Sequence, residues 1–344
     1  MRRYNVAILG ATGAVGAEFV KLLEERDFPV ENLRLLASPR SAGRRMPFRG
    51  EELVVEAVSD DSFRGVDIAF FSAGAGVSRE WAPKAVQSGA LVIDNSSAFR
   101  MDSDVPLVVP EVNRDVLRSH RGIIANPNCS TAIMVVALAP IHRAARIKRV
   151  VVSTYQAVSG AGAAAIAELE EQVRAFAQQK SAPARVLPVA SLEKHYPIAF
   201  NLIPHIDRFD ALGYTKEEWK MVHETRKIMG APDLAVSPTT VRVPVFRCHS
   251  ESINVETERH LSAEEARRLL EEAEGVVVVD DPEAMLYPMP LDVVGKDPVY
   301  VGRIRQDPSI PNGLNLWVVG DQLRKGAALN GIQIAEEVCA QGLL

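Results

Sequence analysis

A short apolar segment followed by three spaced glycines places the strongest constraint on the fold. Residues 4–9 have the pattern of a buried strand, the glycines are Gly10, Gly13 and Gly16, and helical periodicity runs through residues 15–25. A strand that turns on glycines into a helix is typical of a βαβ unit whose helix N-terminus binds a phosphate group. The spacing differs from the common G-x-G-x-x-G pattern, so a purely structural turn is the alternative.

Short apolar strands and helices continue to alternate over the first 128 residues. Further strands are predicted at residues 33–37, 67–71, 91–94, 107–109 and 122–125, with a helix through residues 81–88. This alternation predicts a parallel sheet covered by helices on both faces. We therefore predict an α/β, Rossmann-like dinucleotide-binding domain over residues 1–128.

The pattern changes after residue 129, where strands become longer and more alternating. Strands are predicted at residues 148–156, 235–243, 249–256, 276–279, 299–304 and 313–319, helices at 162–177, 216–229 and 262–273, and a surface loop at 180–185. This pattern predicts an α+β domain with a mixed or antiparallel sheet over residues 129–325. A last helix, at about residues 326–344, is expected to pack back on the first domain.

Composition excludes several classes of function. The 344 residues are 47% apolar, which suffices for two cores, and the net charge of −5 comes without a basic block. Binding to nucleic acid or to an anionic membrane is therefore not expected as a main function. The apolar runs fall short of the roughly 18 residues that span a bilayer, and the N-terminal residues lack a signal-peptide pattern. The three cysteines form no disulfide framework and no metal-ligand spacing, so we expect a cytoplasmic protein without a metal.

Cys129 is the candidate nucleophile. It lies in the sequence Asn126-Pro127-Asn128-Cys129-Ser130-Thr131, after a short apolar strand and at the start of a long apolar helix. A thiol in the first turn of a helix meets free backbone N–H groups and the partial positive charge of the helix N-terminus, both of which favour the thiolate. A small buried hydrophobe is the alternative, but the flanking polar residues argue against it.

The end of the second strand indicates which dinucleotide would bind. An NAD site usually has an acidic residue there for the ribose hydroxyls, whereas this strand ends in Ala37-Ser38-Pro39-Arg40-Ser41. Arg40 and Ser41 suit a 2′-phosphate, so we predict NADP; a solvated loop charge is the alternative for Arg40. Further cofactor contacts are expected at the C-terminal ends of later strands, namely Ser72, Ala73, Gly74 and Asn95.

A thiol together with a nicotinamide cofactor suggests thioester chemistry, which requires an acid or base and pockets for charged groups. Thr215 and Glu218 fit a helix capping box, which leaves Glu217 on the same helix face as Lys220. An ordinary surface ion pair is the alternative for these two residues. Arg242 and His249 lie in or beside predicted strands and could point inward; a sheet-surface arginine and a structural histidine are the alternatives.

Nine motifs together are similar to those of the aspartate-β-semialdehyde dehydrogenase family, over essentially the whole chain. They are GATGAVG (10–16), SPRSAG (38–43), FSAG (71–74), DNSSAFRMD (94–102), PNCST (127–131), YQAVSGAG (155–162), EEWKMVHETRKI (217–228), RVPVFRCHS (242–250) and GDQLRKGAALN (320–330). The resemblance implies reversible NADP-dependent reductive dephosphorylation of L-aspartyl 4-phosphate to L-aspartate 4-semialdehyde and phosphate. It also implies that residues 129–325 form the catalytic and dimerisation domain, through which the chain forms a homodimer or a homotetramer. The implied setting is the synthesis of lysine, threonine, isoleucine, methionine and diaminopimelate.

The resemblance also implies a role for each site residue. Cys129 is the acyl-thioester nucleophile and His249 the acid/base, while Gln156 orients the substrate and Asn128 assists. Arg242 would hold the substrate carboxylate, Glu217 its ammonium group, and Arg100 and Lys220 the phosphate. The implied cofactor contacts are Thr12, Gly13, Ala14, Val15, Arg40, Ser41, Ser159, Gly160 and Gln322.

Two alternatives stay open. One is a related acyl-phosphate reductase such as N-acetyl-γ-glutamyl-phosphate reductase, whose substrate amine is acetylated and uncharged. A carboxylate at Glu217 would then lack a charged partner, which favours free aspartate. The other is a non-catalytic homologue kept for binding or regulation, against which the presence of Cys129, Gln156, Arg242 and His249 argues.

Overall fold

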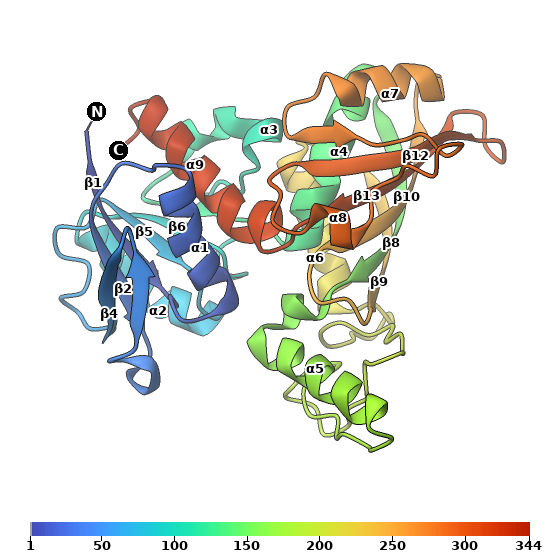
Figure 1. Cartoon of the computed structure of the whole chain (residues 1–344). Coiled ribbons are helices and arrows are strands. Elements are labelled where there is room, and N and C mark those ends of the chain that lie inside the picture. The colour runs from blue at the N-terminus through green and yellow to red at the C-terminus, as the bar shows by residue number, and fades with distance from the viewer. Residues whose placement is uncertain (1) are drawn as a thin grey trace. The chain divides into compact units, whose positions relative to one another are not determined.

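The computed structural model describes residues 2–344, which form two compact units (Figure 1). The first unit comprises residues up to Asn128 together with Gly326–Leu344, and the second comprises Cys129–Lys325. Among the described residues, no helix is both long enough and apolar enough to cross a membrane. Each unit has its own sheet and its own core, and the predicted fold class, a nucleotide-binding α/β domain with a mixed-sheet α+β domain, is confirmed.

The first unit is built on a seven-stranded sheet with the order β3-β4-β2-β1-β5-β6-β7. The strands are β1 (Tyr4–Leu9), β2 (Val30–Ala37), β3 (Arg45–Phe48), β4 (Glu51–Ala57), β5 (Ile68–Phe71), β6 (Leu91–Asp94) and β7 (Ile123–Ala125). The helices are α1 (Ala14–Glu25), α2 (Ala75–Gln87), the short α3 (Pro110–Asn113) and α9 (Leu329–Ala340). The apolar strands pair in parallel and are buried, as expected for a sheet covered by helices.

The sequence prediction is wrong at two places in this sheet. It misses the antiparallel hairpin β3–β4, whose two-residue turn at Arg49 and Gly50 has φ values of 50° and 81°. Such turns usually carry Asn-Gly or Asp-Gly. The arginine at the first position does not match this pattern, so the sequence does not indicate a hairpin here. It also predicts a strand at residues 107–109, where Leu107 makes only an isolated bridge to Ala125 and a proline begins α3.

Helices α1 and α9 pack into one core with the sheet, although they come from opposite ends of the sequence. Phe19 of α1 stacks on Phe70 of β5 with ring centroids 4.7 Å apart. Ile332 of α9 is buried in the same cluster, and Gly331 lies so close that an added Cβ would be 2.9 Å from the Phe19 ring. The last helix therefore completes the first unit rather than the second.

The second unit is built on a six-stranded mixed sheet with the order β11-β12-β13-β10-β8-β9. The strands are β8 (Ile147–Gln156), β9 (Ala235–Arg242), β10 (His249–Thr257), β11 (Val276–Val278), β12 (Val299–Asp307) and β13 (Gly313–Gly320). The helices are α4 (Cys129–Ala145), α5 (Ala163–Ala177), α6 (Lys216–Ile228), α7 (Ala263–Glu271) and α8 (Pro290–Val293). Strand β10 pairs antiparallel with β8 and β13, and β8 pairs parallel with β9.

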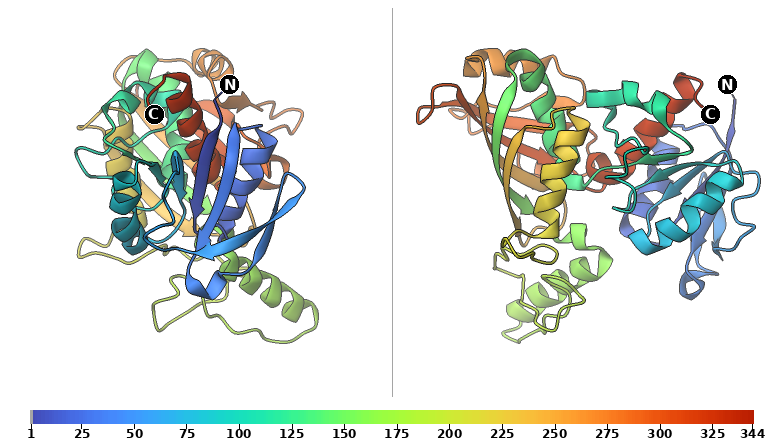
Figure 2. Two further views of the ribbon diagram at one scale, coloured as in Figure 1. Left: turned by 90° about the vertical axis from the view of Figure 1, so that its left-hand side faces the viewer. Right: turned by 180° about the vertical axis from the view of Figure 1, so that it is seen from behind.

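One face of this sheet is covered by helices α4 and α6, which Figure 2 shows from behind. Alternate residues of β10 from His249 onward point to that covered face and are buried, because side chains alternate along a strand. The opposite face carries the exposed Ser252 and the exposed Tyr155 ring, which lies 5.5 Å from Trp317. The ends of β8, β9 and β10 thereby bring Gln156, Arg242 and His249 onto the same side.

Candidate active site

The glycine turn after β1 closes tightly at the N-terminus of α1. Gly10 has φ +89°, and a Cβ there would approach the carbonyl oxygen of Ser72 to 2.5 Å. A Cβ at Gly16 would lie 2.1 Å from the carbonyl oxygen of Gly10. Gly13 is the N-cap residue of α1 and supplies no capping side chain, so the helix N-terminus can receive a phosphate group. The neighbouring Thr12, Ala14 and Val15 are half-buried around it.

The other predicted cofactor residues of the first unit follow neighbouring parallel strands and so share one edge of the sheet. Arg40 is exposed in a short turn, Pro39–Ser41, after β2. Ser72, Ala73 and Gly74 follow β5, and Asn95 follows β6. The end of β2 thus carries a cation and hydroxyl groups, with no acidic residue between Ala37 and Ser41.

Arg100 is buried in the first unit and bound to the backbone there. Its Nε donates to the carbonyl oxygen of Asn126 and its Nη2 to that of Asn95, each at 2.9 Å. The side chain of Asn126 in turn donates to the Asn95 amide oxygen at 2.7 Å and accepts from Asn330 at 2.6 Å. This network of amides, which the sequence analysis did not predict, fixes the position of the guanidinium group.

Cys129 is the first residue of α4, as its sequence context predicts, and follows the buried Asn128. Its half-buried Sγ lies 3.4 Å from Nε2 of His249, a residue 120 positions later in the chain. A thiol at a helix N-terminus beside an imidazole is an arrangement found in nucleophilic catalysis.

His249 is fully buried at the start of β10, with its other ring nitrogen bound to the backbone. The N–H of Ala157 donates to Nδ1 at 3.0 Å. Burial and the neighbouring positive charge of Arg242 lower the pKa of His249 to about 3, against a smaller opposing effect of Glu217. The ring is therefore neutral in the protein at neutral pH.

Arg242 ends β9 and is only 4% exposed. Its Nη1 donates to the carbonyl oxygen of Ala157 at 2.7 Å, while its buried Nε has no acceptor among residues 2–344. Burial lowers the pKa of Arg242, and the charges of Glu217 and Cys129 raise it. A buried guanidinium with an unused donor fits a carboxylate ligand, so the reading of Arg242 as a sheet-surface residue is wrong.

Glu217 and Lys220 lie near the start of α6, and Glu217 contacts Gln156 at the end of β8. The predicted capping box of Thr215 and Glu218 is confirmed, and Glu217 is 6% exposed. Its Oε2 accepts from Lys220 Nζ at 3.1 Å, and its Oε1 accepts from Gln156 Nε2 at 3.4 Å. The pair is therefore not an ordinary exposed ion pair.

Three predicted cofactor residues of the second unit contact the thiol site or its supports. Gln322 accepts from the Cys248 N–H at 2.7 Å and donates to the Ser159 hydroxyl. A Cβ at Gly160 would lie 2.9 Å from Nη1 of Arg242 and 3.1 Å from Cε1 of His249. No larger residue fits at position 160 without displacing these two side chains.

Two parts of the site were missed by the sequence analysis. Asp207 lies in a polar loop and accepts from Lys220 Nζ at 3.2 Å. Nothing in its sequence context distinguishes it from a solvated loop residue. The peptide group of Ala157 binds both His249 and Arg242, but backbone groups leave no signal in residue identity.

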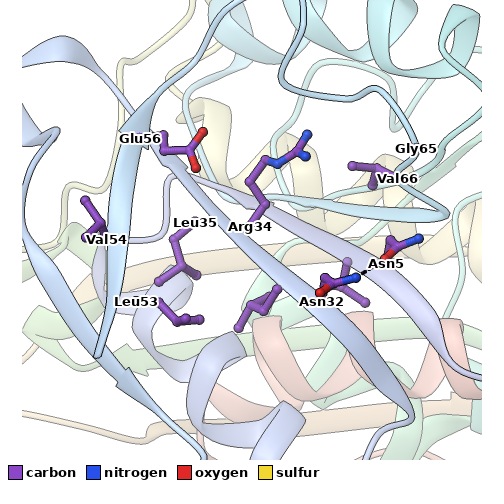
Figure 3. A pocket seen from close by; sticks show the side chains of 11 residues that line it. Asn5, Asn32, Arg34, Leu35, Leu53, Val54, Glu56, Gly65 and Val66 are labelled. Atoms are coloured by element: carbon purple, nitrogen blue, oxygen red, sulfur yellow. Dashed lines mark hydrogen bonds between the residues drawn. The ribbon is translucent and has the colours of Figure 1, made fainter. Parts of the chain in front are cut away.

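A separate groove in the first unit contains none of the predicted site residues (Figure 3). It is lined by β1, β2 and β4, and includes Asn5, Asn32 and Arg34. Asn5 and Asn32 bond each other through their side chains at 2.8 Å. The groove therefore lies apart from the glycine turn.

The nucleotide-binding fold and the α+β unit with its thiol define a class of two-domain dehydrogenase. Residues 5–120 match the family model for the semialdehyde dehydrogenase NAD binding domain. Residues 138–325 match the model for the semialdehyde dehydrogenase dimerisation domain. Both models agree with the class that the fold indicates.

Comparison with individual relatives shows which family within this class the chain belongs to. The chain is 56% identical over 345 residues to the aspartate-semialdehyde dehydrogenase of Aquifex aeolicus, covering 99% of each chain, and 54% identical to that of Bacillus subtilis, covering 98% of each. The crystal structure of Vibrio cholerae aspartate semialdehyde dehydrogenase II complexed with ASA matches with a TM-score of 0.94 and 48% identity over 99% of both chains. The Candida albicans enzyme with NADP matches with a TM-score of 0.77 and 26% identity over 100% of both. The chain belongs to the aspartate-semialdehyde dehydrogenase family, and the predicted resemblance is confirmed.

Proposed function

We propose that this chain catalyses the reversible, NADP-dependent reductive dephosphorylation of L-aspartyl 4-phosphate to L-aspartate 4-semialdehyde and phosphate. The observation that carries the proposal is the cluster in the second unit, where Cys129 Sγ lies 3.4 Å from His249 Nε2 and where Arg242 and Glu217 are both buried. A nucleophile, a hydrogen-bonding ring, a cation and an anion are the groups required by an amino acid with a reactive side-chain acyl group.

In the proposed reaction the Cys129 thiolate attacks the acyl carbon of the bound substrate. A C–S bond forms, the C–O bond to phosphate breaks, and its electron pair leaves with the phosphate. When bound, NADPH would supply a hydride to the thioester carbon. The C–S bond then breaks, its electron pair returns to the Cys129 sulfur, and the aldehyde is released. Arg242 and Glu217 hold the two charged ends of the amino acid, while Gln156 and Asn128 orient the acyl group.

Phosphate is expected to bind Arg100 and Lys220. Arg100 has its guanidinium fixed by two backbone carbonyls, and Lys220 is held between Glu217 and Asp207. Cations that are already held in position stabilise a leaving phosphate with little free-energy cost of reorganisation. The proposed setting is the synthesis of lysine, threonine, isoleucine, methionine and diaminopimelate.

The acetylated-substrate alternative is disfavoured by Glu217. This carboxylate is almost fully buried, and its charge is balanced within the site by Lys220. A free substrate ammonium can form a second ion pair with this carboxylate. An acetylated nitrogen is uncharged and cannot form that ion pair. The non-catalytic alternative gives no reason for the contact between Cys129 and His249.

NADP is the proposed cofactor, with Arg40 and Ser41 at the 2′-phosphate. Replacing Arg40 with alanine is expected to raise KM for NADP by about 10-fold, and to leave KM for NAD within about 2-fold, because one charge-assisted contact is worth roughly 1.5 kcal/mol. Steady-state kinetics with both cofactors measure this, with the exposed Arg44→Ala as a matched control. Equal KM increases for the two cofactors would remove Arg40 from the 2′-phosphate site.

The oligomer is proposed to be a homodimer, with a homotetramer as the alternative, formed through the second unit, whose family model describes a dimerisation domain. The uncovered part of the six-stranded sheet around Ser252 and the Tyr155–Trp317 pair is the proposed interface. Light scattering should give twice the chain mass for the wild type and a smaller mass for Ser252→Glu. A monomeric wild type would rule out this part of the proposal.

The test of the reaction is NADP reduction with L-aspartate semialdehyde plus phosphate, compared with N-acetylglutamate semialdehyde plus phosphate. Phosphate-dependent turnover with the aspartyl substrate alone is expected. Turnover with the acetylated substrate alone would keep the thioester chemistry and overturn the assignment of Glu217. No turnover with either substrate would favour the non-catalytic alternative.

A further inference from the structure

Arg100 is held by the backbone of two residues that also bond each other through their side chains. Its Nε donates to the carbonyl oxygen of Asn126 and its Nη2 to that of Asn95, each at 2.9 Å. These two residues are 31 positions apart in the chain, and Asn126 Nδ2 donates to Asn95 Oδ1 at 2.7 Å. The side-chain bond therefore fixes the separation of the two carbonyl oxygens, and through them the position of the guanidinium group.

The carbonyl group of Asn126 depends on this side-chain bond because the sheet does not hold it. Strand β7 ends at Ala125, and the next residue after Asn126 is Pro127, which has no N–H to donate. The N–H of Asn126 donates to the carbonyl oxygen of Asp94 at 2.8 Å, but the Asn126 carbonyl lies beyond the end of the strand. The Asn126 side chain thus restrains a peptide group that regular strand pairing leaves unsupported.

Asn330 of α9 is the far end of an amide relay that consists of Asn330, Asn126 and Asn95. Its Nδ2 donates to Asn126 Oδ1 at 2.6 Å and to the carbonyl oxygen of Val108 at 2.8 Å. Asn126 Nδ2 donates to the carbonyl oxygen of Ala327 at 2.8 Å as well as to Asn95. Asn126 and Asn330 are both 0% exposed, so the relay is anchored inside the first unit.

Backbone carbonyl groups determine which way each amide of the relay is turned. A carbonyl oxygen can only accept, so Val108 requires an N–H of Asn330, and Ala327 requires an N–H of Asn126. Asn126 Oδ1 is then the acceptor for Asn330, and Asn126 Nδ2 is the donor to Asn95. The relay consequently runs in one direction, and a side chain at position 330 that lacks a donor cannot complete it.

We propose that Asn330 is a positioning residue for phosphate binding, which acts through Asn126 and Asn95 to hold Arg100 where its guanidinium group binds the substrate phosphate. The inference rests on the proposed role of Arg100 and extends it to a residue of the last helix. Because Asn330 is fully buried, it acts only through its neighbours. A guanidinium group that is already ordered binds a phosphate with less loss of conformational freedom than a mobile one.

Replacing Asn330 with alanine removes the donor and keeps a residue that favours the helix. We expect KM for inorganic phosphate to rise roughly 10-fold, a change that corresponds to one weakened charge-assisted hydrogen bond. Both kcat and KM for L-aspartate semialdehyde should stay within about 2-fold, because the groups proposed to bind the semialdehyde lie in the other unit. Steady-state kinetics with varied phosphate measure this. An unchanged KM for phosphate would overturn the proposal.

Asn113 offers a matched control for loss of stability, since it is another asparagine of the first unit with two backbone hydrogen bonds. Its Oδ1 accepts from the Val109 N–H, and its Nδ2 donates to the carbonyl oxygen of Leu107, both at 2.9 Å. We expect Asn113→Ala to lower the midpoint of thermal unfolding, as Asn330→Ala does, but to leave KM for phosphate unchanged. A rise of this KM in both variants would indicate general destabilisation and contradict the positioning role.

Phosphate binding can also be measured without turnover, by ³¹P NMR titration of the full-length protein with inorganic phosphate in the absence of cofactor. We expect Kd to rise roughly 10-fold in Asn330→Ala and also in Asn95→Ala, which cuts the relay at its half-buried end. The second variant keeps the test open if the first one does not fold. Equal Kd values in the wild type and both variants would overturn the inference.

A double variant separates action through Arg100 from a general effect on the unit. In an Arg100→Ala background, the further change Asn330→Ala should raise Kd for phosphate no more, because the relay acts through the missing guanidinium group. A full additional rise of Kd would show that Asn330 acts by another route and would sink the proposal. Failure of the proposed reaction would appear separately, as absent turnover in a wild type whose phosphate affinity still depends on Asn330 and Arg100.

Discussion

Replacing Cys129 with alanine is expected to lower phosphate-dependent oxidation of L-aspartate semialdehyde by a factor on the order of 10⁴ or more. The side chain of alanine cannot form the C–S bond, so the covalent intermediate is lost, while the sheet and the helix N-terminus stay in place. Stopped-flow absorbance of NADPH, at enzyme concentrations high enough for a single turnover, measures the residual rate.

Thiol labelling provides the matched control. Burial raises the pKa of the Cys248 thiol well above its ordinary value, and burial also raises the pKa of Cys339. Iodoacetamide at pH 7 should therefore label the wild type at Cys129 alone. Cys339→Ser should keep both activity and labelling, whereas Cys129→Ala should lose both. Full activity in Cys129→Ala would eliminate the thioester mechanism.

Replacing Arg242 with lysine is expected to lower kcat/KM for L-aspartate semialdehyde by roughly 10²–10³, or about 3–4 kcal/mol. An ammonium group cannot keep the hydrogen bond to Ala157 and also present a fork to the substrate carboxylate. The loss should appear mainly in KM for the semialdehyde, with KM for NADP unchanged. The exposed Arg149→Lys, on the same sheet, is the control and should behave as the wild type.

A substrate without the carboxylate separates binding from general disruption of the site. 3-Aminopropanal lacks the group that Arg242 is proposed to hold, so the wild type should use it poorly. Arg242→Lys should use it nearly as well as the wild type does, because the missing interaction is absent in both. If the variant loses the same factor with both substrates, Arg242 does not bind the carboxylate.

Much of the fold could be predicted because its signals are local. The strands β1 and β6 have the predicted bounds, since each is a short apolar run that ends at a glycine or a polar residue. The start of α4 at Cys129 and the capping box of α6 follow from neighbouring residues in the same way. The β3–β4 hairpin was missed because its turn requires a positive φ at position 49, and the arginine there is not a residue type that indicates a positive φ.

The sequence by itself determined which chemical groups are available: a thiol at a helix N-terminus, a glycine turn after the first strand, an arginine at the end of the second, and the family to which these motifs belong. Only the tertiary structure decided how the groups meet, because Cys129 and His249 are separated by 120 residues and are joined through the covered face of a sheet. It also decided that Arg242 and Glu217 are buried, since burial depends on which helices cover them. The His249 ring is held by a hydrogen bond from the N–H of Ala157, and a backbone donor acts through its position in space, which residue identity does not encode.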